Sequence, residues 1–462
     1  MSLSIRENVP LRDLTTFRVG GLARYFCVVT NETELVESVR FSRTKKIPFF
    51  VLGGGSNIVV GDSGWNGLVI KMEIKGISCD PDYGRDYCPD CGRDMVPEGH
   101  QEKIGQLTEK VVTKAASAAS ADFSNKNSKK TAHNSVPLSE ISEKNELSEN
   151  NGEDTMTCHR CHTCHLCHSS ASPHPSADTI RVTAGAGENW DDFVGTCVAR
   201  GFHGLENLSG IPGTVGAAPV QNIGAYGSEV SQTIASVRVF DATKDAGENA
   251  KKMEFIELSA EDCHFGYRDS IFKHKKYIIV SATFNLKKNA PLTINYKDVR
   301  EYFLKNKKAE PSVGDVRCAI IAIRAAKLPD LRIVGTAGSF FKNPIISQKH
   351  FAELKKKYPD LPSFPVASVG IDSKAPSVKV PLAWILDHIC GYKGAKRGNV
   401  GTYKNQALVI VNDFSSASGF GGAIGATSAT ALEIKKFAEE IAAAVKEKTD
   451  IDIEPEVQYV GE

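Results

Sequence analysis

The stretch IPFFVLGGGSN, residues 47–57, sets our first expectation about the fold, because an apolar strand runs directly into three consecutive glycines. Glycine adopts positive φ without steric cost and lets backbone N–H groups come close to a ligand. Such a loop forms a nest for anions and suits phosphates. A tight turn or bulge without a ligand is the alternative reading of the same residues.

A second glycine-rich loop, SGIPGTVGAAPVQNIGAYG at residues 209–227, has few polar or aromatic groups besides Gln221, Asn222 and Tyr226. A loop of small residues can lie flat against a cofactor. Neither loop is a P-loop, because no Gly-Lys-Ser/Thr follows, and GAGENW at 185–190 lacks the third glycine of a Rossmann turn. Support for a standard P-loop or Rossmann motif is therefore weak.

Strand and helix patterns extend outward from the two loops. Apolar runs typical of strands occupy residues 23–29, 47–52, 66–72, 236–242, 277–286, 407–412 and 451–461. Helical spacing is found at 32–46, after Asn189 or Asp191, and at 428–450. Residues 79–178 lack any such period, so we expect a largely disordered insert. The strands on its two sides are expected to pair as a hairpin that carries the insert at its tip.

The bulk composition is that of an ordinary water-soluble protein. Lys and Arg number 56 against 55 Asp and Glu, which disfavours nucleic acid or acidic membrane as the main partner. The N-terminus lacks an apolar signal region, and no apolar run reaches membrane-spanning length, so we expect a cytoplasmic protein. At 462 residues, two or three domains are expected.

Three further motifs carry candidate chemical groups. FGYRDSIFK at 265–273 contains Arg268, GTAGSFFKNP at 335–344 contains Ser339, and EPEV at 454–457 contains Glu456. Each has a plain alternative: a structural ion pair, an ordinary turn hydroxyl and a solvated acid. Ser339 has no histidine near it in sequence and lies outside a GxSxG elbow, which argues against a Ser-His-Asp nucleophile.

Taken in order, VGG, LGGGSN, LSGIPGTVGAAPVQNIGAYG, FGYRDSIFK, RAAKLPD, GTAGSFFKNP and EPEV closely resemble the UDP-N-acetylenolpyruvoylglucosamine reductase family over nearly the whole chain outside the insert. The resemblance implies an α+β protein with an FAD-binding fold of the vanillyl-alcohol oxidase type in two subdomains, plus an α/β substrate-binding domain. The implied bounds are 1–72 and 73–326 for the subdomains, 327–453 for the substrate domain and 454–462 for a strand with the catalytic glutamate.

The resemblance also implies a reaction. NADPH reduces FAD, and the reduced flavin passes a hydride to the enolpyruvyl double bond of UDP-GlcNAc-enolpyruvate in peptidoglycan precursor synthesis. By their match to the family's motifs, Ser339 is the expected proton donor to C2, and Arg268 and Glu456 are expected to stabilise the enol intermediate. Such a reaction needs both a proton donor and stabilisation of negative charge.

The expected ligand contacts are also carried over from the family. The cofactor-binding set comprises Gly53, Gly54, Gly55, Ser56, Asn57, Gly213, Gly216 and Gly224. The substrate-binding set comprises Tyr267, Tyr296, Arg324, Lys327, Asn343 and Gln406. Gln458 departs from the family, in which an arginine often stands there, so one anion contact is in doubt. A monomer is expected.

The insert contains closely spaced cysteines and histidines. A zinc site is one expectation, with Cys88, Cys91, Cys158, Cys161, Cys164 and Cys167 as its candidate ligands. A segment without metal is the alternative, and CxxCH haem attachment is a weak third. For the whole chain, another FAD-dependent oxidoreductase of the same fold, or a non-catalytic binder of nucleotide sugars or metal, remains the competing hypothesis.

Overall fold

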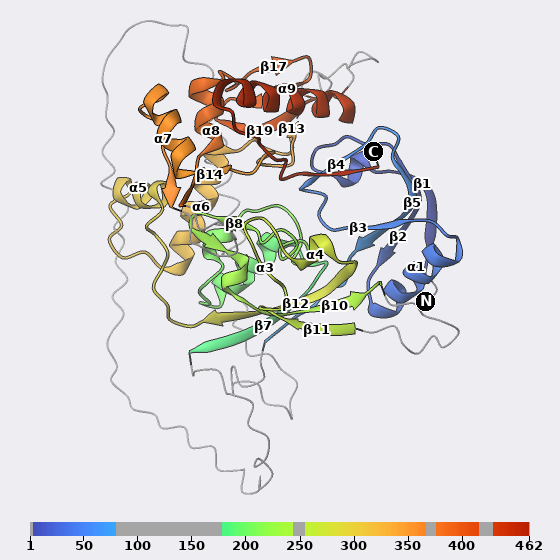
Figure 1. The fold of residues 1–462 in the computed structure, drawn as a ribbon. Helices are drawn as coiled ribbons and strands as arrows, with labels where there is room; N and C mark the ends of the chain where they lie inside the picture. The colour runs from blue at the N-terminus through green and yellow to red at the C-terminus, as the bar shows by residue number, and fades with distance from the viewer. Residues whose placement is uncertain (1–2, 80–177, 244–254, 366–375, 415–427, 462) are drawn as a thin grey trace, which may run out of the picture.

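The computed structural model describes residues 3–79, 178–243, 255–365, 376–414 and 428–461. Figure 1 shows two sheets of the first half of the chain below a C-terminal region of helices and short strands. Among the described residues, no helix is both long and apolar enough to cross a membrane.

The N-terminal sheet has the strand order β1-β2-β5-β3, made of β1 (Ile5–Pro10), β2 (Leu22–Val29), β5 (Trp65–Met72) and β3 (Phe49–Leu52). The pairs β2–β5 and β3–β5 are parallel, and α1 (Glu32–Thr44) makes the crossover between β2 and β3. Asn31 caps α1 by accepting a hydrogen bond from the Glu34 backbone N–H. Since β3 ends at Leu52, the three glycines follow it directly at the end of the strand.

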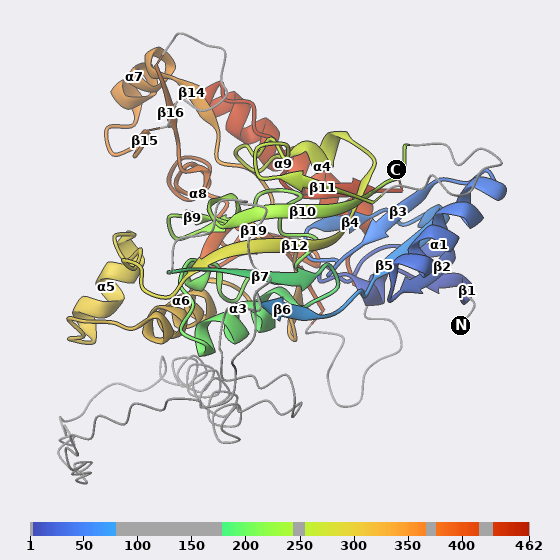
Figure 2. The same ribbon diagram turned by 90° about the horizontal axis from the view of Figure 1, so that it is seen from below.

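The second sheet has five strands in the order β11-β10-β12-β7-β6, seen side by side in Figure 2. They are β11 (Phe255–Ser259), β10 (Ile234–Asp241), β12 (Tyr277–Lys287), β7 (Thr179–Gly185) and β6 (Ile77–Cys79). The strands β6 and β7 pair antiparallel, which confirms the hairpin expected across the insert. Cys79, the first residue of the expected insert, is the last residue of β6.

Helices α3 (Trp190–Ala199) and α4 (Ile271–His274) pack against the core of this sheet, and α5 (Lys297–Lys305) and α6 (Val313–Lys327) form a separate hydrophobic cluster. The single turns η2 (Glu206–Leu208) and η3 (Val230–Gln232) lie between α3 and β10, and η1 (Arg12–Leu14) lies between β1 and β2 of the N-terminal sheet. Asn189, not Asp191, caps α3, because its side chain accepts hydrogen bonds from two backbone N–H groups of the first turn. Asp191 instead forms a two-point ion pair with Arg317, at 2.6 and 2.9 Å, that joins α3 to α6.

The C-terminal region has a separate hydrophobic core, in which Phe340, Leu386 and Ile441 are fully buried. Its four-stranded sheet has the order β13-β19-β18-β17, and a three-stranded sheet has the order β14-β16-β15. The elements are β13 (Val334–Gly335), β14 (Ile345–Ser347), α7 (Gln348–Lys357), β15 (Phe364–Pro365), β16 (Ser377–Lys379), α8 (Leu382–Trp384), η5 (Ile385–Ile389), β17 (Lys396–Arg397), β18 (Val400–Tyr403), β19 (Gln406–Asp413) and α9 (Ala431–Thr449).

The end of the chain returns to the N-terminal half. The strand β20 (Gln458–Val460) pairs in parallel with β4 (Ile58–Val60), close to the N-terminal sheet (Figure 1). The ribbon pair β8 (Gly224–Ala225) and β9 (Ser228–Glu229) closes the second glycine-rich loop. The expected final strand is therefore present but short, and it places Glu456 beside the first glycine loop. The α+β fold class expected from the sequence is confirmed.

Candidate active site

A cavity of about 1220 Å³ lies where the two glycine-rich loops meet the C-terminal region. Most of the residues predicted from the sequence line it. These are Gly53, Gly54, Gly55, Ser56, Asn57, Gly213, Gly216, Gly224, Arg268, Tyr296, Arg324, Lys327, Ser339, Gln406 and Glu456. Of the predicted set, Tyr267 and Asn343 do not line this cavity, and the Asn343 backbone N–H donates to the Tyr267 hydroxyl at 3.3 Å.

The two glycine loops pack against each other with no room for side chains. A Cβ placed on Gly54 would lie 2.6 Å from the Gly213 Cα, and one on Gly216 would lie 2.5 Å from the Ala186 Cβ. Gly55 has φ +64°, in the left-handed region. The Ser56 hydroxyl donates to the Pro212 carbonyl at 2.8 Å, which joins the loops. Glycine is therefore required here for loop packing as well as for backbone conformation.

The cavity wall fits a phosphate-bearing cofactor. Thr214 lines the cavity, and its buried hydroxyl has no hydrogen-bond partner among the described residues. A buried hydroxyl without a partner is costly, and a ligand oxygen would satisfy it. Behind the first loop, the Lys71 ammonium donates to the Gly53 carbonyl at 2.8 Å and is paired with Glu73 at 3.0 Å. The glycine nests and the free hydroxyl together suit a diphosphate.

Asn57 connects the first glycine loop to the C-terminal strand. Its side-chain amide donates to the Glu456 backbone carbonyl at 3.1 Å and also to the Gln221 side chain. The Asn57 backbone carbonyl accepts from the Gln458 N–H at 3.0 Å. Asn57 is predicted from the family resemblance to contact the cofactor. The structure shows that its amide group also fixes the backbone that carries Glu456.

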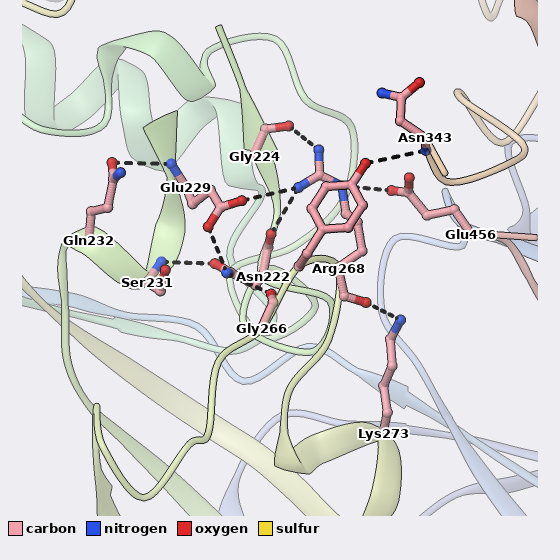
Figure 3. A network of polar contacts seen from close by, with 11 residues as sticks. Asn222, Gly224, Glu229, Ser231, Gln232, Gly266, Arg268, Lys273, Asn343 and Glu456 are labelled. Carbon is pink, nitrogen blue, oxygen red and sulfur yellow. Dashed lines mark hydrogen bonds and ion pairs between the residues drawn. The ribbon is translucent and has the colours of Figure 1, made fainter. Parts of the chain in front are cut away.

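Arg268 and Glu456 form an ion pair at the cavity wall, with 3.2 Å between Nε and Oε1 (Figure 3). The side chains are only 17% and 14% exposed, so water screens the pair weakly. Arg268 has φ +54° in a two-residue turn between Gly266 and Asp269. A non-glycine residue in this conformation costs about 1–2 kcal/mol and is common at functional sites.

Burial and nearby cations act in opposite directions on Glu456. Burial raises the pKa of its carboxyl group above the ordinary value, against the lowering effect of Arg268, Lys273 and Lys342. Burial also lowers the pKa of Lys273, whose ammonium donates to the Arg268 carbonyl at 2.7 Å. A carboxyl group with a raised pKa stays protonated to higher pH than a solvated one, and in the protonated form it can donate a hydrogen bond.

Ser339 follows Gly338, which has φ +77°, and its backbone is bridged to Val409 of β19. Its side chain is exposed at the cavity wall, and its hydroxyl has no hydrogen-bond partner among the described residues. Phe340 and Phe341, which come next, are buried in the C-terminal core. The phenylalanines thus anchor the turn and leave the serine hydroxyl free to contact a ligand.

The predicted substrate-binding residues differ in their exposure and in the contacts that they already make within the protein. Tyr296 is 46% exposed and its ring meets Tyr226 edge-on at 5.4 Å. The Arg324 guanidinium donates to the Gly210 carbonyl at 3.0 Å, and the Lys327 ammonium forms a 2.5 Å ion pair with Asp298. Gln406 accepts a long hydrogen bond, 3.4 Å, from Leu408 N–H.

Sequence reasoning gave no role to several residues that complete the site. Glu229 and Asn222 contact Arg268 from the side opposite Glu456 (Figure 3). Thr214 lies in the second glycine loop. A carboxylate directly after a glycine-rich loop was the available signal for Glu229. Nothing in the sequence signals that Asn222 is buried or that it meets Glu229.

The zinc prediction falls on Cys88, Cys91, Cys158, Cys161, Cys164 and Cys167, all of which lie outside the described residues. Within the ranges that the structure does describe, no cluster of three or more His, Cys, Asp or Glu residues could hold a metal ion.

Comparisons with known proteins agree with this geometry. The family model described as UDP-N-acetylenolpyruvoylglucosamine reductase, C-terminal domain, matches residues 329–460. The FAD binding domain model matches residues 23–85 and 175–245, on either side of the insert.

Curated proteins named UDP-N-acetylenolpyruvoylglucosamine reductase are similar to the chain. One from Chromobacterium violaceum is 40% identical over 60% of this chain and 74% of its own length. One from Porphyromonas gingivalis is 39% identical over 62% of this chain and 77% of its own length. The crystal structure of a UDP-N-acetylenolpyruvylglucosamine reductase from Thermus caldophilus covers both chains fully with a TM-score of 0.50 and 17% identity, a likeness of fold.

Proposed function

The chain belongs to the UDP-N-acetylenolpyruvoylglucosamine reductase family, and from this premise we propose that it reduces UDP-GlcNAc-enolpyruvate to UDP-N-acetylmuramate with FAD and NADPH. The family resemblance read from the ordered motifs is thereby confirmed, and the protein is an FAD-dependent oxidoreductase. NADPH as the reductant, a monomeric state and a cytoplasmic location remain predictions. Production of a peptidoglycan precursor follows from the proposed product.

The two glycine loops would hold the FAD diphosphate. Backbone N–H groups of Gly53, Gly54 and Gly55 would bind phosphate oxygens, and the Thr214 hydroxyl would donate a further hydrogen bond. When bound, FAD supplies the hydride chemistry, because it accepts a hydride from NADPH and delivers one to C3 of the enolpyruvyl group. The free Thr214 hydroxyl and the glycine packing support this assignment.

Hydride addition at C3 leaves an electron pair at C2, in conjugation with the substrate carboxylate. Arg268 would bind that carboxylate and offset the charge that develops on it, and Glu456 in its protonated form would donate a hydrogen bond to it. The weakly screened position of both groups makes each interaction stronger than it would be in water. Their direct contact at 3.2 Å supports the proposal that they act as a unit.

Ser339 would then complete the addition. Its hydroxyl would transfer a proton to C2, so that the double bond gains a hydride at one carbon and a proton at the other. A serine is a weak acid, but a carbanion is a strong base, so the transfer is favourable once the bound substrate brings C2 to the hydroxyl. The free hydroxyl at the cavity wall supports this role.

The remaining polar residues suit the nucleotide sugar. Arg324 and Lys327 bring two cations to the cavity wall, and we propose that they face the substrate diphosphate. Tyr296 would cover the nucleotide and Gln406 would contact the sugar, while Asn343 and Tyr267, which bond each other, would support the site from outside the cavity lining. Lys327 would have to share its charge with Asp298.

The observation that carries this proposal is the Arg268–Glu456 pair in the same cavity as the triple-glycine loop and Ser339. The test is a spectrophotometric assay of the purified full-length protein. It should be yellow and should oxidise NADPH steadily only when UDP-GlcNAc-enolpyruvate is present. Steady oxidation without that substrate, or with a simple alcohol or sugar in its place, would support a different flavin-dependent oxidoreductase. Colourless protein that still binds UDP-sugars would contradict the enzyme assignment.

A further inference from the structure

Acidic side chains lie on two sides of the Arg268 guanidinium (Figure 3). Glu456, from the C-terminal segment, contacts Nε at 3.2 Å, and Glu229, from β9, lies 3.9 Å from Nη1. The two carboxylates lie on either side of the guanidinium, and of the two only Glu456 lines the cavity. Glu229 is the more exposed, at 40%, so its charge is screened more than that of Glu456 at 14%.

Asn222 holds Glu229 in place. Its side-chain amide donates to Glu229 Oε2 at 3.2 Å and to the Gly266 carbonyl at 3.0 Å, and its Oδ1 accepts from the Ser231 N–H at 3.1 Å. Asn222 is 1% exposed and has φ +45°. A buried amide whose donors and acceptor are all used fixes the groups that it joins. Glu229 is therefore held beside Arg268.

Gly224 lies against both the Arg268 and the Glu229 side chains. Its carbonyl accepts from Arg268 Nη2 at 2.6 Å, and the Asn222 carbonyl accepts from Nη1 at 3.4 Å. A Cβ on Gly224 would lie 2.9 Å both from Arg268 Nη1 and from Glu229 Cγ. Gly224 is predicted from the family resemblance to contact the cofactor. The structure shows that it also makes room for the arginine and the glutamate.

We propose that Glu229, held by Asn222, is a positioning residue that orients the Arg268 guanidinium and reduces the positive charge that Arg268 presents to Glu456 and to the substrate carboxylate. This inference rests on the proposed function. An arginine fully neutralised by one buried partner would bind the substrate poorly, and an arginine with no second acid would hold Glu456 ionised. An exposed second carboxylate that interacts weakly with Arg268 leaves the guanidinium with a partly reduced positive charge toward Glu456 and the substrate.

The charged groups around Glu456 set its pKa, which the pH dependence of the reaction would report. Arg268, Lys273 and Lys342 face it with positive charge, and burial opposes them. Tyr267 lies against the Arg268 guanidinium at 5.4 Å, and Lys342 also pairs with Glu454 at 3.1 Å. Loss of the Glu229 charge makes the field at Glu456 more positive, so the pKa of Glu456 falls, whichever of its protonation states is active.

The experiment measures the pH dependence of the reaction of reduced flavin with UDP-GlcNAc-enolpyruvate, in the FAD-loaded full-length protein. The ionisation of Glu456 is first identified as the one that Glu456→Gln removes from the wild-type profile. In Glu229→Gln we expect a rate loss of roughly ten-fold, typical of coupled neighbours, and a shift of that ionisation to lower pH. Glu229→Asp keeps the charge and should give a smaller loss and a smaller shift.

The matched control is Gln232→Ala. Gln232 accepts a hydrogen bond from the Glu229 backbone N–H at 3.2 Å, so its loss disturbs the same turn without a change of charge beside Arg268. We expect the wild-type pH profile in this variant. If Glu229→Gln slows the reaction but has the same pH profile as Gln232→Ala, Glu229 is only structural and the inference is wrong. If the wild-type protein does not turn over the substrate at all, the proposed function is wrong instead.

Discussion

Gly54→Ala should weaken FAD binding because the two glycine loops touch at this point. The added Cβ would lie 2.6 Å from the Gly213 Cα, whereas carbon atoms in contact stay about 3.5–4 Å apart, so the loops would have to separate by about 1 Å. Both sides of the contact are backbone, so no side chain can rotate to relieve it. Overpacking of this kind costs about 1–3 kcal/mol.

If that cost falls on the cofactor-bound state, FAD affinity should drop by between about five-fold and one-hundred-fold. Titration of apoprotein with FAD, followed by flavin fluorescence, measures the change. Gly314→Ala is the matched control, because a Cβ there meets only the Ser312 hydroxyl at 3.7 Å in the first turn of α6. Wild-type FAD affinity in Gly54→Ala would refute the proposal that the two glycine loops hold the FAD diphosphate. If thermal stability falls while FAD affinity is unchanged, Gly54 serves only to pack the loops.

Three further predictions follow from the site. Ser339→Ala should leave flavin reduction by NADPH nearly intact and slow the reaction of reduced flavin with substrate, as measured by stopped-flow absorbance; equal losses in both half-reactions would indicate a structural role. In the folded state burial raises the pKa of Glu456 above its unfolded value of about 4.3, so the folded protein holds a proton that the unfolded chain has lost, and its contribution to stability declines as pH rises through that window. Urea unfolding should therefore show that the free energy of unfolding of wild type falls relative to that of Glu456→Gln as pH rises above about 4.3. A difference between the two proteins that stays constant with pH would contradict the raised pKa. Asn57→Ala removes two side-chain hydrogen bonds, to the Glu456 carbonyl and to Gln221, and should lower the free energy of unfolding by about 1–3 kcal/mol in the same assay; a wild-type value would show that these bonds do not hold the C-terminal strand.

The sequence by itself determined the local elements of this protein. Helices α1, α3 and α9 form where apolar spacing and a capping side chain coincide, and Thr430 with Glu433 forms the capping box of α9. The glycine loops are equally local, since positive φ and close backbone approach depend on residue type. The hairpin of β6 and β7 was predictable because an insert interrupts the chain without changing which strands pair.

Ordered motifs also identified Arg268, Ser339 and Glu456 as candidates, but the sequence could not show how they meet. Asn57 and Glu456 are 399 residues apart in the chain, and they come together only because β20 pairs with β4. Likewise, Glu229 gains its place beside Arg268 from a buried asparagine and a glycine without room for a Cβ. Contacts of this kind depend on tertiary packing and on burial, which set both the distance between charges and the screening between them. The sequence thus determined which groups are available, and the tertiary structure decided which of them act on one another.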